Sequence, residues 1–349
     1  MGDIQTKDYK VSVIIPTYNS EKFIKRAVDS VINQTLGFDN IELIIVDDNS
    51  NDRTQDILKE FSKEHENIRT TFLKENTGSP SKPRNIGIMN STSDHIMFLD
   101  QDDAYYPETC EKMYSEAILH DADLVICRPL IYHNFETKKG ISFLDDYANK
   151  IIINSIQEFP GLMRYGFTTL IWNKIFRRSM IINKNVKFPE RALYEDVYFS
   201  VKSYFYSKNI VLLNDFYGYV YNINDSSTST IYLKKNLIKQ FHGLMKIFLF
   251  LEDKPGFETI QCEILAGWFR LFLFTNLDKK TQINLLKQLK PFLNKYSIFV
   301  RLNTVSLPIN VLINITMKIF SININIPIYI HKIPITSLIL KILSYRRSF

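Results

Sequence analysis

Apolar runs separated by polar stretches organise the first hundred residues. Four of these runs are rich in Val, Ile and Leu without polar alternation, which is typical of strands buried on both faces. They cover residues 11–15, 41–46, 68–73 and 96–99. Apolar residues recur at helical spacing between them, over residues 21–33, 54–62 and 84–89. Strands and helices that alternate over short connections predict an α/β fold with a parallel, doubly wound sheet.

The pattern is less regular further along the chain. Helices are predicted over residues 107–120, 155–165 and 197–206, and strands over 123–127, 210–213 and 217–221. Residues 128–160 otherwise read as irregular, with a turn at 135–140. Amphipathic helices are predicted over 237–251, 258–277 and 281–293, and an Ile- and Asn-rich tail with few acids follows. We therefore expect one domain over residues 1–230 and a mainly helical region over 231–349.

Polar residues follow each of the four predicted strands. They are Thr17, Tyr18 and Asn19 after Pro16, then Asp47 and Asp48, then Asn76, and finally Asp100, Gln101, Asp102 and Asp103. In doubly wound sheets the carboxyl ends of the strands border the ligand crevice. We therefore expect these four clusters to face one ligand.

The last cluster has the composition of a metal site. Hard cations such as Mg²⁺ and Mn²⁺ prefer oxygen ligands, and one or two carboxylates plus substrate phosphates suffice. Asp100 and Asp102 are two positions apart, so on an extended backbone their side chains point to the same side. The competing interpretation is a solvated strand end with turn-forming aspartates.

The same clusters suit a nucleotide diphosphate. Asp48 is placed to accept the imide N–H of uracil, and Asn76 to bind the edge of the base. Arg84 can grip a phosphate as a planar fork, with Lys82 as a second candidate. Asp102 would hold the divalent ion, and Asp100 faces the ribose or that ion.

Two other features have both a functional and a structural interpretation. Glu195 and Asp196 precede a predicted helix, where they serve either as a general base for an acceptor hydroxyl or as helix-capping acids. Trp172 lies in an apolar run, where it lines an acceptor site or belongs to the core.

Composition and charge exclude several other classes. The net charge of +6 is too weak and too dispersed to indicate nucleic-acid binding. The three cysteines are far apart and predict reduced thiols. No zinc-binding or glycine-rich phosphate-loop motif is present. The polar N-terminus and the lack of an apolar run of about 18 residues predict a cytoplasmic chain.

Five motifs in order resemble the family 2 glycosyltransferases with the GT-A fold. They are VSVIIPTYN at Val11–Asn19, IVDDNSND at Ile45–Asp52, the segment Asn76–Gly87, FLDQDD at Phe98–Asp103 and YED at Tyr194–Asp196. The resemblance implies a nucleotide-diphospho-sugar transferase fold, a Rossmann-like mixed sheet flanked by helices. Within residues 1–230 it implies a nucleotide-binding half, 1–103, and an acceptor-binding half, 104–230. The loop at Gly78–Arg84 is similar to that of wall teichoic acid and surface-polysaccharide enzymes.

The resemblance also implies a reaction. A UDP-sugar would bind at Thr17–Asn19 and Asp48, and Mn²⁺ or Mg²⁺ at Asp102 beside Asp100. Asp196 would act as the base in an inverting transfer to a lipid-linked or polymeric cell-surface glycan. The Gln-x-x-Arg-Trp motif of processive members is absent, so we expect the addition of single sugars.

Three matters stay open at this point. A nucleotidyltransferase also pairs carboxylates with Mg²⁺, but it needs a glycine-rich phosphate loop. A degenerate sugar-nucleotide-binding scaffold would have lost its acids, whereas Asp100, Asp102 and Asp196 are present. The basic, amphipathic tail either contacts the inner face of the cell membrane or packs on protein, including a second copy in a homo-oligomer.

Overall fold

The structure is a computed structural model, and it describes most of the first 261 residues. The described residues are 8–133, 136–139, 148–163, 169–190, 192–222, 237–252, 254, 255, 257, 261, 299–302 and 305–308. The chain divides into two compact units, Met1–Gln261 and Cys262–Phe349. The described elements of the second unit are the strands β11 (Phe299–Leu302) and β12 (Val305–Pro308), which pair antiparallel.

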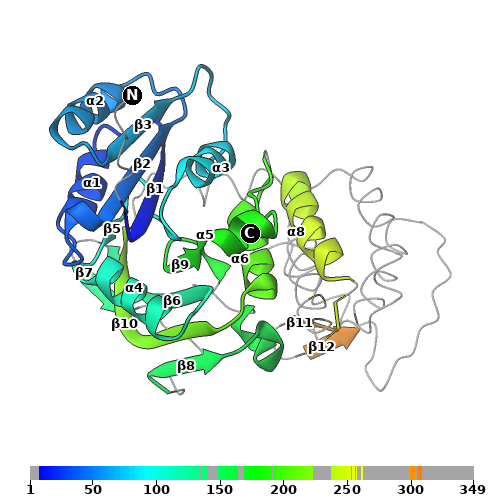
Figure 1. Cartoon of the computed structure of the whole chain (residues 1–349). Coiled ribbons are helices and arrows are strands. Elements are labelled where there is room, and N and C mark those ends of the chain that lie inside the picture. Colours follow the sequence, from blue (N-terminus) through cyan, green and yellow to red (C-terminus); the bar gives the residue numbers. More distant parts are fainter. Residues whose placement is uncertain are drawn as a thin grey trace. The chain divides into compact units, whose positions relative to one another are not determined.

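A mixed sheet forms the centre of the first unit (Figure 1). Its described strands lie in the order β3-β2-β1-β4-β9-β6-β10-β5, with β7 paired to β6 and β8 to β10. The strands are β1 (Val11–Thr17), β2 (Ile41–Asp47), β3 (Ile68–Phe72), β4 (His95–Phe98), β5 (Ala104–Tyr105), β6 (Leu124–His133), β7 (Glu136–Lys139), β8 (Lys150–Ile153), β9 (Lys174–Arg177) and β10 (Ile210–Asn222).

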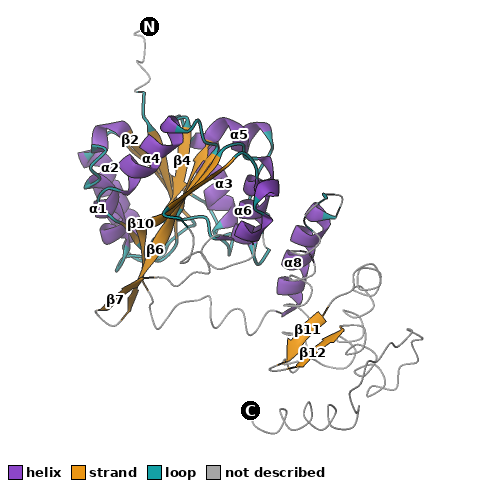
Figure 2. Cartoon of the chain, turned by 90° about the horizontal axis from the view of Figure 1, so that it is seen from below, coloured by secondary structure: helices purple, strands orange, loops and turns teal. Residues whose placement is uncertain are grey.

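Helices cover both faces of this sheet (Figure 2). In that view α1, α2 and α4 lie on one side of the sheet, and α3, α5 and α6 lie on the other. The helices are α1 (Ile24–Ile32), α2 (Thr54–Glu64), α3 (Ser81–Asn90), α4 (Thr109–Leu119), α5 (Arg178–Asn183), α6 (Glu195–Tyr206) and α8 (Leu237–Leu251). Short 3₁₀ turns are η1 (Phe38–Asn40), η2 (Ile156–Glu158) and η3 (Pro160–Met163).

The predicted parallel strands are confirmed in the N-terminal half. β1 pairs in parallel with β2 and β4, and β2 pairs in parallel with β3. Every residue of β1 and β2 is buried, which explains their continuous apolar runs. Helix α3 approaches β1 closely because it carries Gly87. A Cβ at this position would lie 2.3 Å from Cγ2 of Ile14, so the glycine fixes the height of α3 above the sheet.

The C-terminal half of the sheet departs from the predictions. Strand β9 runs antiparallel to both β4 and β6. The sheet is therefore mixed, as the family resemblance implied, and not wholly parallel as the alternation of strands and helices predicted. The described residues between 128 and 160 include regular structure: β6 continues to His133, and Glu136–Lys139 forms β7 where we expected a turn. Two predicted strands over 210–221 form the single strand β10, with register shifts between Leu212 and Tyr219. The described part of the predicted helix at 155–165 contains two 3₁₀ turns instead.

Helix α8 has the predicted bounds, and it belongs to the first unit. That unit therefore extends beyond residue 230, where the change in composition placed the boundary. The predicted helices at 258–277 and 281–293, and most of the basic tail, lie outside the described residues. Among the described residues, no helix combines the length and the apolar character needed to cross a membrane.

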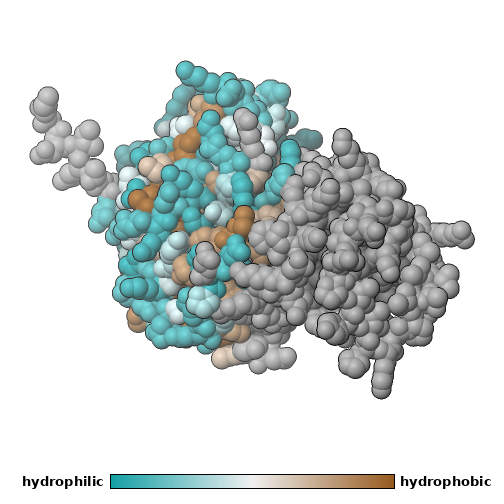
Figure 3. All heavy atoms as spheres, turned by 90° about the vertical axis from the view of Figure 1, so that its right-hand side faces the viewer, coloured by the Kyte–Doolittle hydropathy of each residue, from teal (hydrophilic) through white to brown (hydrophobic). Residues whose placement is uncertain are grey.

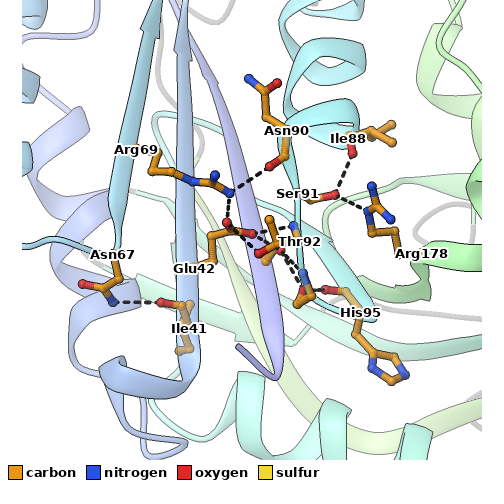
Figure 4. Close-up of polar contacts among 12 residues, drawn as sticks. Ile41, Glu42, Asn67, Arg69, Ile88, Asn90, Ser91, Thr92, His95 and Arg178 are labelled. Carbon is orange, nitrogen blue, oxygen red and sulfur yellow. Dashed lines mark hydrogen bonds and ion pairs between the residues drawn. The ribbon is translucent and has the colours of Figure 1, made fainter. Parts of the chain in front are cut away.

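A polar network closes the amino-terminal edge of the parallel strands (Figure 4). The buried carboxylate of Glu42 accepts hydrogen bonds from Ser12 Oγ at 2.5 Å and from the Thr92 backbone N–H at 2.9 Å, and it pairs with Arg69. These contacts tie β1, β2 and β3 to the turn before β4. Because this edge is opposite the strands' carboxyl ends, we interpret the network as structural. On the face in Figure 3 the described surface is mostly hydrophilic, with small scattered apolar patches.

Candidate active site

The carboxyl ends of β1 and β4 are joined by one side chain, Gln101. Its Oε1 accepts hydrogen bonds from Thr17 Oγ1 at 3.0 Å and from the Tyr18 backbone N–H at 2.7 Å. The next residue, Asn19, has a left-handed backbone with φ of 48°, and its Oδ1 accepts the N–H of Asn51 at 2.9 Å. The loops after β1, β2 and β4 are therefore connected. Tyr18 is 41% exposed and faces solvent at this edge.

The two aspartates that end β2 have different roles. Asp47 is buried and accepts hydrogen bonds from the Ser50 backbone N–H at 2.9 Å and from Gln55 Nε2 at 2.8 Å, so it folds its own loop. Asp48 accepts the backbone N–H and the hydroxyl of Thr77, each at 3.0 Å. Burial raises the pKa of Asp48, and the bonds from Thr77 oppose that rise.

Asn76 completes the link between these loops. Its Nδ2 donates to the carbonyl of Asp48 at 3.1 Å, and its Oδ1 accepts the N–H of Gly78 at 2.8 Å. Gly78 has φ of +71°, which a glycine adopts without strain. A polar pocket of about 100 Å³ lies beside this turn. It is lined by Glu75, Asn76, Thr77, Ser79, Ser81, Lys82 and Glu190.

Arg84 is the charged centre of the site. The first turn of α3 carries this residue, which is only 5% exposed. Its Nη2 contacts Asp100 Oδ1 at 2.8 Å and its Nη1 contacts Glu195 Oε1 at 3.4 Å, while the guanidinium lies 5.3 Å from the ring centroid of Phe188. Burial disfavours the charge, but Asp100 and Glu195 outweigh it and raise the pKa of Arg84. The end of β4 and the start of α6 thus meet at one cation.

Glu195 and Asp196 form the first turn of α6. Burial raises the pKa of Glu195 to about 7; the charge of Asp196 adds to the rise and Arg84 opposes it. Burial also raises the pKa of Asp196, and Arg84 again opposes the rise. Asp196 Oδ1 accepts the N–H of Val197 at 2.8 Å. Asp196 thus accepts one backbone N–H of the first turn of α6, whereas the N-cap residue, Tyr194, makes no side-chain capping bond.

The segment Asp100–Asp103 is a turn, not an extended strand. The N–H of Asp103 donates to the carbonyl of Asp100 at 3.1 Å, because the chain must turn to enter β5. The expectation that Asp100 and Asp102 share a side through strand alternation is therefore wrong. The backbone carbonyl of Asp102 accepts the side chain of Arg26. The acids of Asp100–Asp103 therefore lie on a turn, and strand alternation does not determine the directions of their side chains.

Asp103 is an anchor for this turn. It is 1% exposed and accepts the Tyr219 hydroxyl at 2.6 Å and the Asn222 N–H at 2.8 Å. Burial raises the pKa of Asp103 to about 8, with added effect from the charges of Asp100 and Asp102. A buried carboxyl with two protein donors serves to hold the turn in place.

Trp172 lies in an aromatic stack behind the same turn. Its ring stacks on Tyr219 with centroids 4.0 Å apart and on Tyr221 at 5.8 Å. The Tyr219 hydroxyl also accepts the N–H of Asp100 at 3.3 Å. Trp172 is only 6% exposed, so almost all of its surface packs against neighbours such as these tyrosines.

Sequence reasoning missed several residues of this site. Tyr219 holds the acidic turn, and Thr77 binds Asp48. Burial lowers the pKa of the Lys174 amine to about 7, while Asp196 favours its charge. The spacing of Tyr219 and Tyr221 was a detectable signal, since residues two apart share one face of a strand and both rings stack on Trp172. Pro16 contributes only as a buried residue of β1.

Comparison with known proteins agrees with this geometry. Residues 12–179 match the model of Glycosyl transferase family 2. The α/β sheet, the polar edge and this match identify the chain as a glycosyltransferase, with a glycosyltransferase family 2 domain over residues 12–179. The predicted family and GT-A-like fold class are thereby confirmed.

Two curated relatives and one solved structure illustrate the similarity. Glycosyltransferase GlyA of Streptococcus pneumoniae is 28% identical over 65% of this chain and 32% of its own length. Poly(ribitol-phosphate) beta-N-acetylglucosaminyltransferase TarP of Staphylococcus aureus is 29% identical over 79% of this chain and 82% of its own. The chain thus spans about a third of GlyA and most of TarP.

The solved structure is that of S. aureus TarS 1–349 in complex with UDP-GlcNAc. Its TM-score is 0.67, with 23% identity over 82% of this chain and 81% of the TarS chain. At that identity the likeness establishes the fold.

The Tyr219 hydroxyl gives a direct test of the anchored turn. We expect Tyr219→Phe to lower the free energy of unfolding by about 1–3 kcal/mol, because it removes a donor to a buried carboxyl. Urea denaturation measures the change. Tyr221→Phe is the matched control, since Tyr221 is only half buried and stacks on the same tryptophan; its effect should stay within about 0.5 kcal/mol. Equal stability of the two variants would contradict the anchoring role.

Proposed function

We propose that this enzyme transfers a single sugar from a UDP-sugar to a hydroxyl of a cell-surface glycan, polymeric or lipid-linked, with inversion at the anomeric carbon. The observation that carries the proposal is the Arg84 centre, where Asp100 from the end of β4 meets Glu195 beside Asp196. Family membership supports the reaction class. The name of TarP and the UDP-GlcNAc bound to TarS favour a UDP-sugar donor and a polyol-phosphate polymer as acceptor.

The nucleotide would bind at the ends of β1 and β2. A carboxylate has about four acceptor positions, so Asp48 can receive the imide N–H of uracil in addition to its bonds from Thr77. Asn76 and the loop Thr17–Asn19 border the same edge. Lys82 lines the pocket beside Asn76 and adds a positive charge there.

The diphosphate would face Arg84. A guanidinium binds phosphate oxygens as a planar fork, and burial strengthens its field because fewer water molecules screen it. As the bond from the anomeric carbon to the diphosphate breaks, the electron pair leaves with UDP. Arg84 then stabilises the charge that develops on the leaving group.

The attacking hydroxyl must lose its proton to a base. Asp196 has a pKa raised by burial, so its carboxylate holds an accepted proton more firmly than an exposed aspartate does. In this step the acceptor oxygen forms a bond to the anomeric carbon, and its proton passes to Asp196. Glu195, whose pKa is about 7, and the cation Arg84 together determine the charge around Asp196.

A divalent cation fits the donor chemistry of the acidic turn. Asp102, with Asp100 beside it, offers the hard oxygen atoms that Mn²⁺ and Mg²⁺ prefer. Within the described residues, no three His, Cys, Asp or Glu side chains group as a protein-only metal site. A cation here would therefore take part of its coordination from the substrate diphosphate, whose negative charge it would neutralise.

The setting of the reaction stays part of the proposal. We place it in the cytoplasm, on acceptors at the inner face of the cell membrane, with the basic tail as the contact. That tail lies outside the described residues, and a homo-oligomer stays a prediction from the sequence.

Asp196→Asn tests the proposed base. The amide keeps the size of the side chain but cannot accept the proton, so we expect turnover to fall by about 10²–10⁴-fold. Transfer to poly(ribitol-phosphate) from UDP-sugars is the assay, and UDP binding by calorimetry should stay within about twofold of wild type. Asp215→Asn, a change on an exposed carboxylate of β10, is the control. Unchanged turnover in Asp196→Asn would remove the base from this position.

Asp102→Asn tests the cation site. We expect Mn²⁺ to tighten UDP binding to the wild-type enzyme by at least about tenfold, or about 1.4 kcal/mol. The variant should bind UDP without metal as wild type does and lose the gain from Mn²⁺. If Mn²⁺ tightens binding equally in both proteins, the metal is held elsewhere.

A further inference from the structure

Helix α8 makes an unusually close approach to the segment that leads to Asp196. A Cβ added to Gly243 of this helix would lie 1.9 Å from the carbonyl oxygen of Leu193 and 2.9 Å from its carbonyl carbon. The obstructing atoms are backbone, so no side-chain rotation could make room for it. A glycine at position 243 is therefore what allows α8 to lie against residue 193.

A second contact joins the same two segments. The hydroxyl of Tyr194 donates to Oε1 of Gln240 at 3.2 Å. Gln240 precedes Gly243 by three positions, so the two residues lie on one face of α8. That face thus holds both the backbone of Leu193 and the side chain of Tyr194.

The segment held in this way has a strained backbone. Tyr194 has φ of +60°, in the left-handed region that bulky residues rarely adopt, and it immediately precedes the first turn of α6. A conformation of this kind persists only where the surroundings impose it. The next two residues are Glu195, which contacts Arg84 at 3.4 Å, and Asp196.

We infer that α8 is a positioning element for the acid pair. Gly243 and Gln240 hold Leu193 and Tyr194 in the left-handed turn that directs Glu195 and Asp196 toward the Arg84 centre. The role of Asp196 in this inference rests on the proposed function. Helix α8 lies beyond residues 12–179, the region that matches the family model. The catalytic unit therefore includes a helix that the family match does not contain.

Gly243→Ala separates this role from that of an ordinary helical glycine. At an unhindered helix position the change to alanine raises stability and leaves activity alone. Here the new Cβ must displace Leu193, so we expect kcat to fall by about 10- to 100-fold while KM for the UDP-sugar stays within about twofold. Lys246→Ala, on an exposed position of the same helix, should keep wild-type kcat. A Gly243→Ala enzyme with a higher Tm and wild-type kcat would overturn the inference.

Hydrogen exchange tests the positioning without any catalytic assay. We expect the backbone amides of the peptide that contains Leu193–Val197 to exchange faster in Gly243→Ala than in wild type, with exchange in β1 unchanged. If the wild-type enzyme transfers no sugar, the proposed function fails while this measurement still decides the role of α8. Unchanged exchange in this peptide would refute the positioning role even if transfer is confirmed.

Tyr194→Phe provides a second, milder variant if Gly243→Ala does not fold. It removes only the hydroxyl that reaches Gln240. We expect faster exchange over Leu193–Val197 and a kcat lower by about three- to tenfold, with KM for the donor unchanged. Wild-type exchange and wild-type kcat in Tyr194→Phe would overturn the inference.

Discussion

The burial of one cation, Arg84, dictates how this site is assembled. A guanidinium removed from water is costly unless carboxylates and hydrogen bonds compensate it. The fold provides Asp100, which is 16 positions away in sequence, and Glu195, which is 111 positions away. The burial of Arg84 on α3 is therefore compensated when the end of β4 and the start of α6 both lie beside it. Gly87 contributes by letting α3 lie against β1, which sets the depth of Arg84.

The same charge sets the chemistry of the acid pair. Burial raises the pKa of both Glu195 and Asp196, and Arg84 limits the rise. As a result, the carboxylate of Asp196 binds a proton more firmly than a carboxylate in water does. It also lies near Arg84, a cation suited to a leaving diphosphate. Other residues hold these charged groups in their positions. Asp103, Tyr219 and Trp172 fix the turn that carries Asp100, and α8 contacts the residues just before Glu195.

Local sequence patterns were sufficient to predict the strands that are completely buried. Strands β1 and β2 are covered on both faces, so their apolar runs identified them and located the polar residues at their ends. The continuation of β6 and the strand β7 were not predicted, because the sequence over residues 130–133 and 136–139 is mostly polar and aromatic and lacks an unbroken apolar run. Strand β10 looked like two strands because irregular pairing interrupts its apolar pattern.

Long-range geometry was beyond the reach of those patterns. The motifs named Arg84, Asp100 and Glu195 as separate candidates, and their contacts with one another are seen only in the structure. The motifs also treated Asp100–Asp103 as an extended segment, whereas it is a turn. The tyrosine that anchors this turn from β10, Tyr219, is 116 positions away from Asp103 in sequence, so no local pattern links the two residues. The left-handed backbone at Tyr194 likewise depends on α8, which no local pattern links to that residue.

A double-mutant cycle between Arg84→Met and Glu195→Gln, followed by urea denaturation, tests whether the buried Arg84 holds α6 in place through Glu195. Each single change leaves a buried charge of the other residue less well compensated, whereas the double change removes both charges. We expect the two losses of unfolding free energy not to be additive, with a coupling of about 1–3 kcal/mol. Additivity within about 0.5 kcal/mol would show that Arg84 does not hold α6 to the rest of the site.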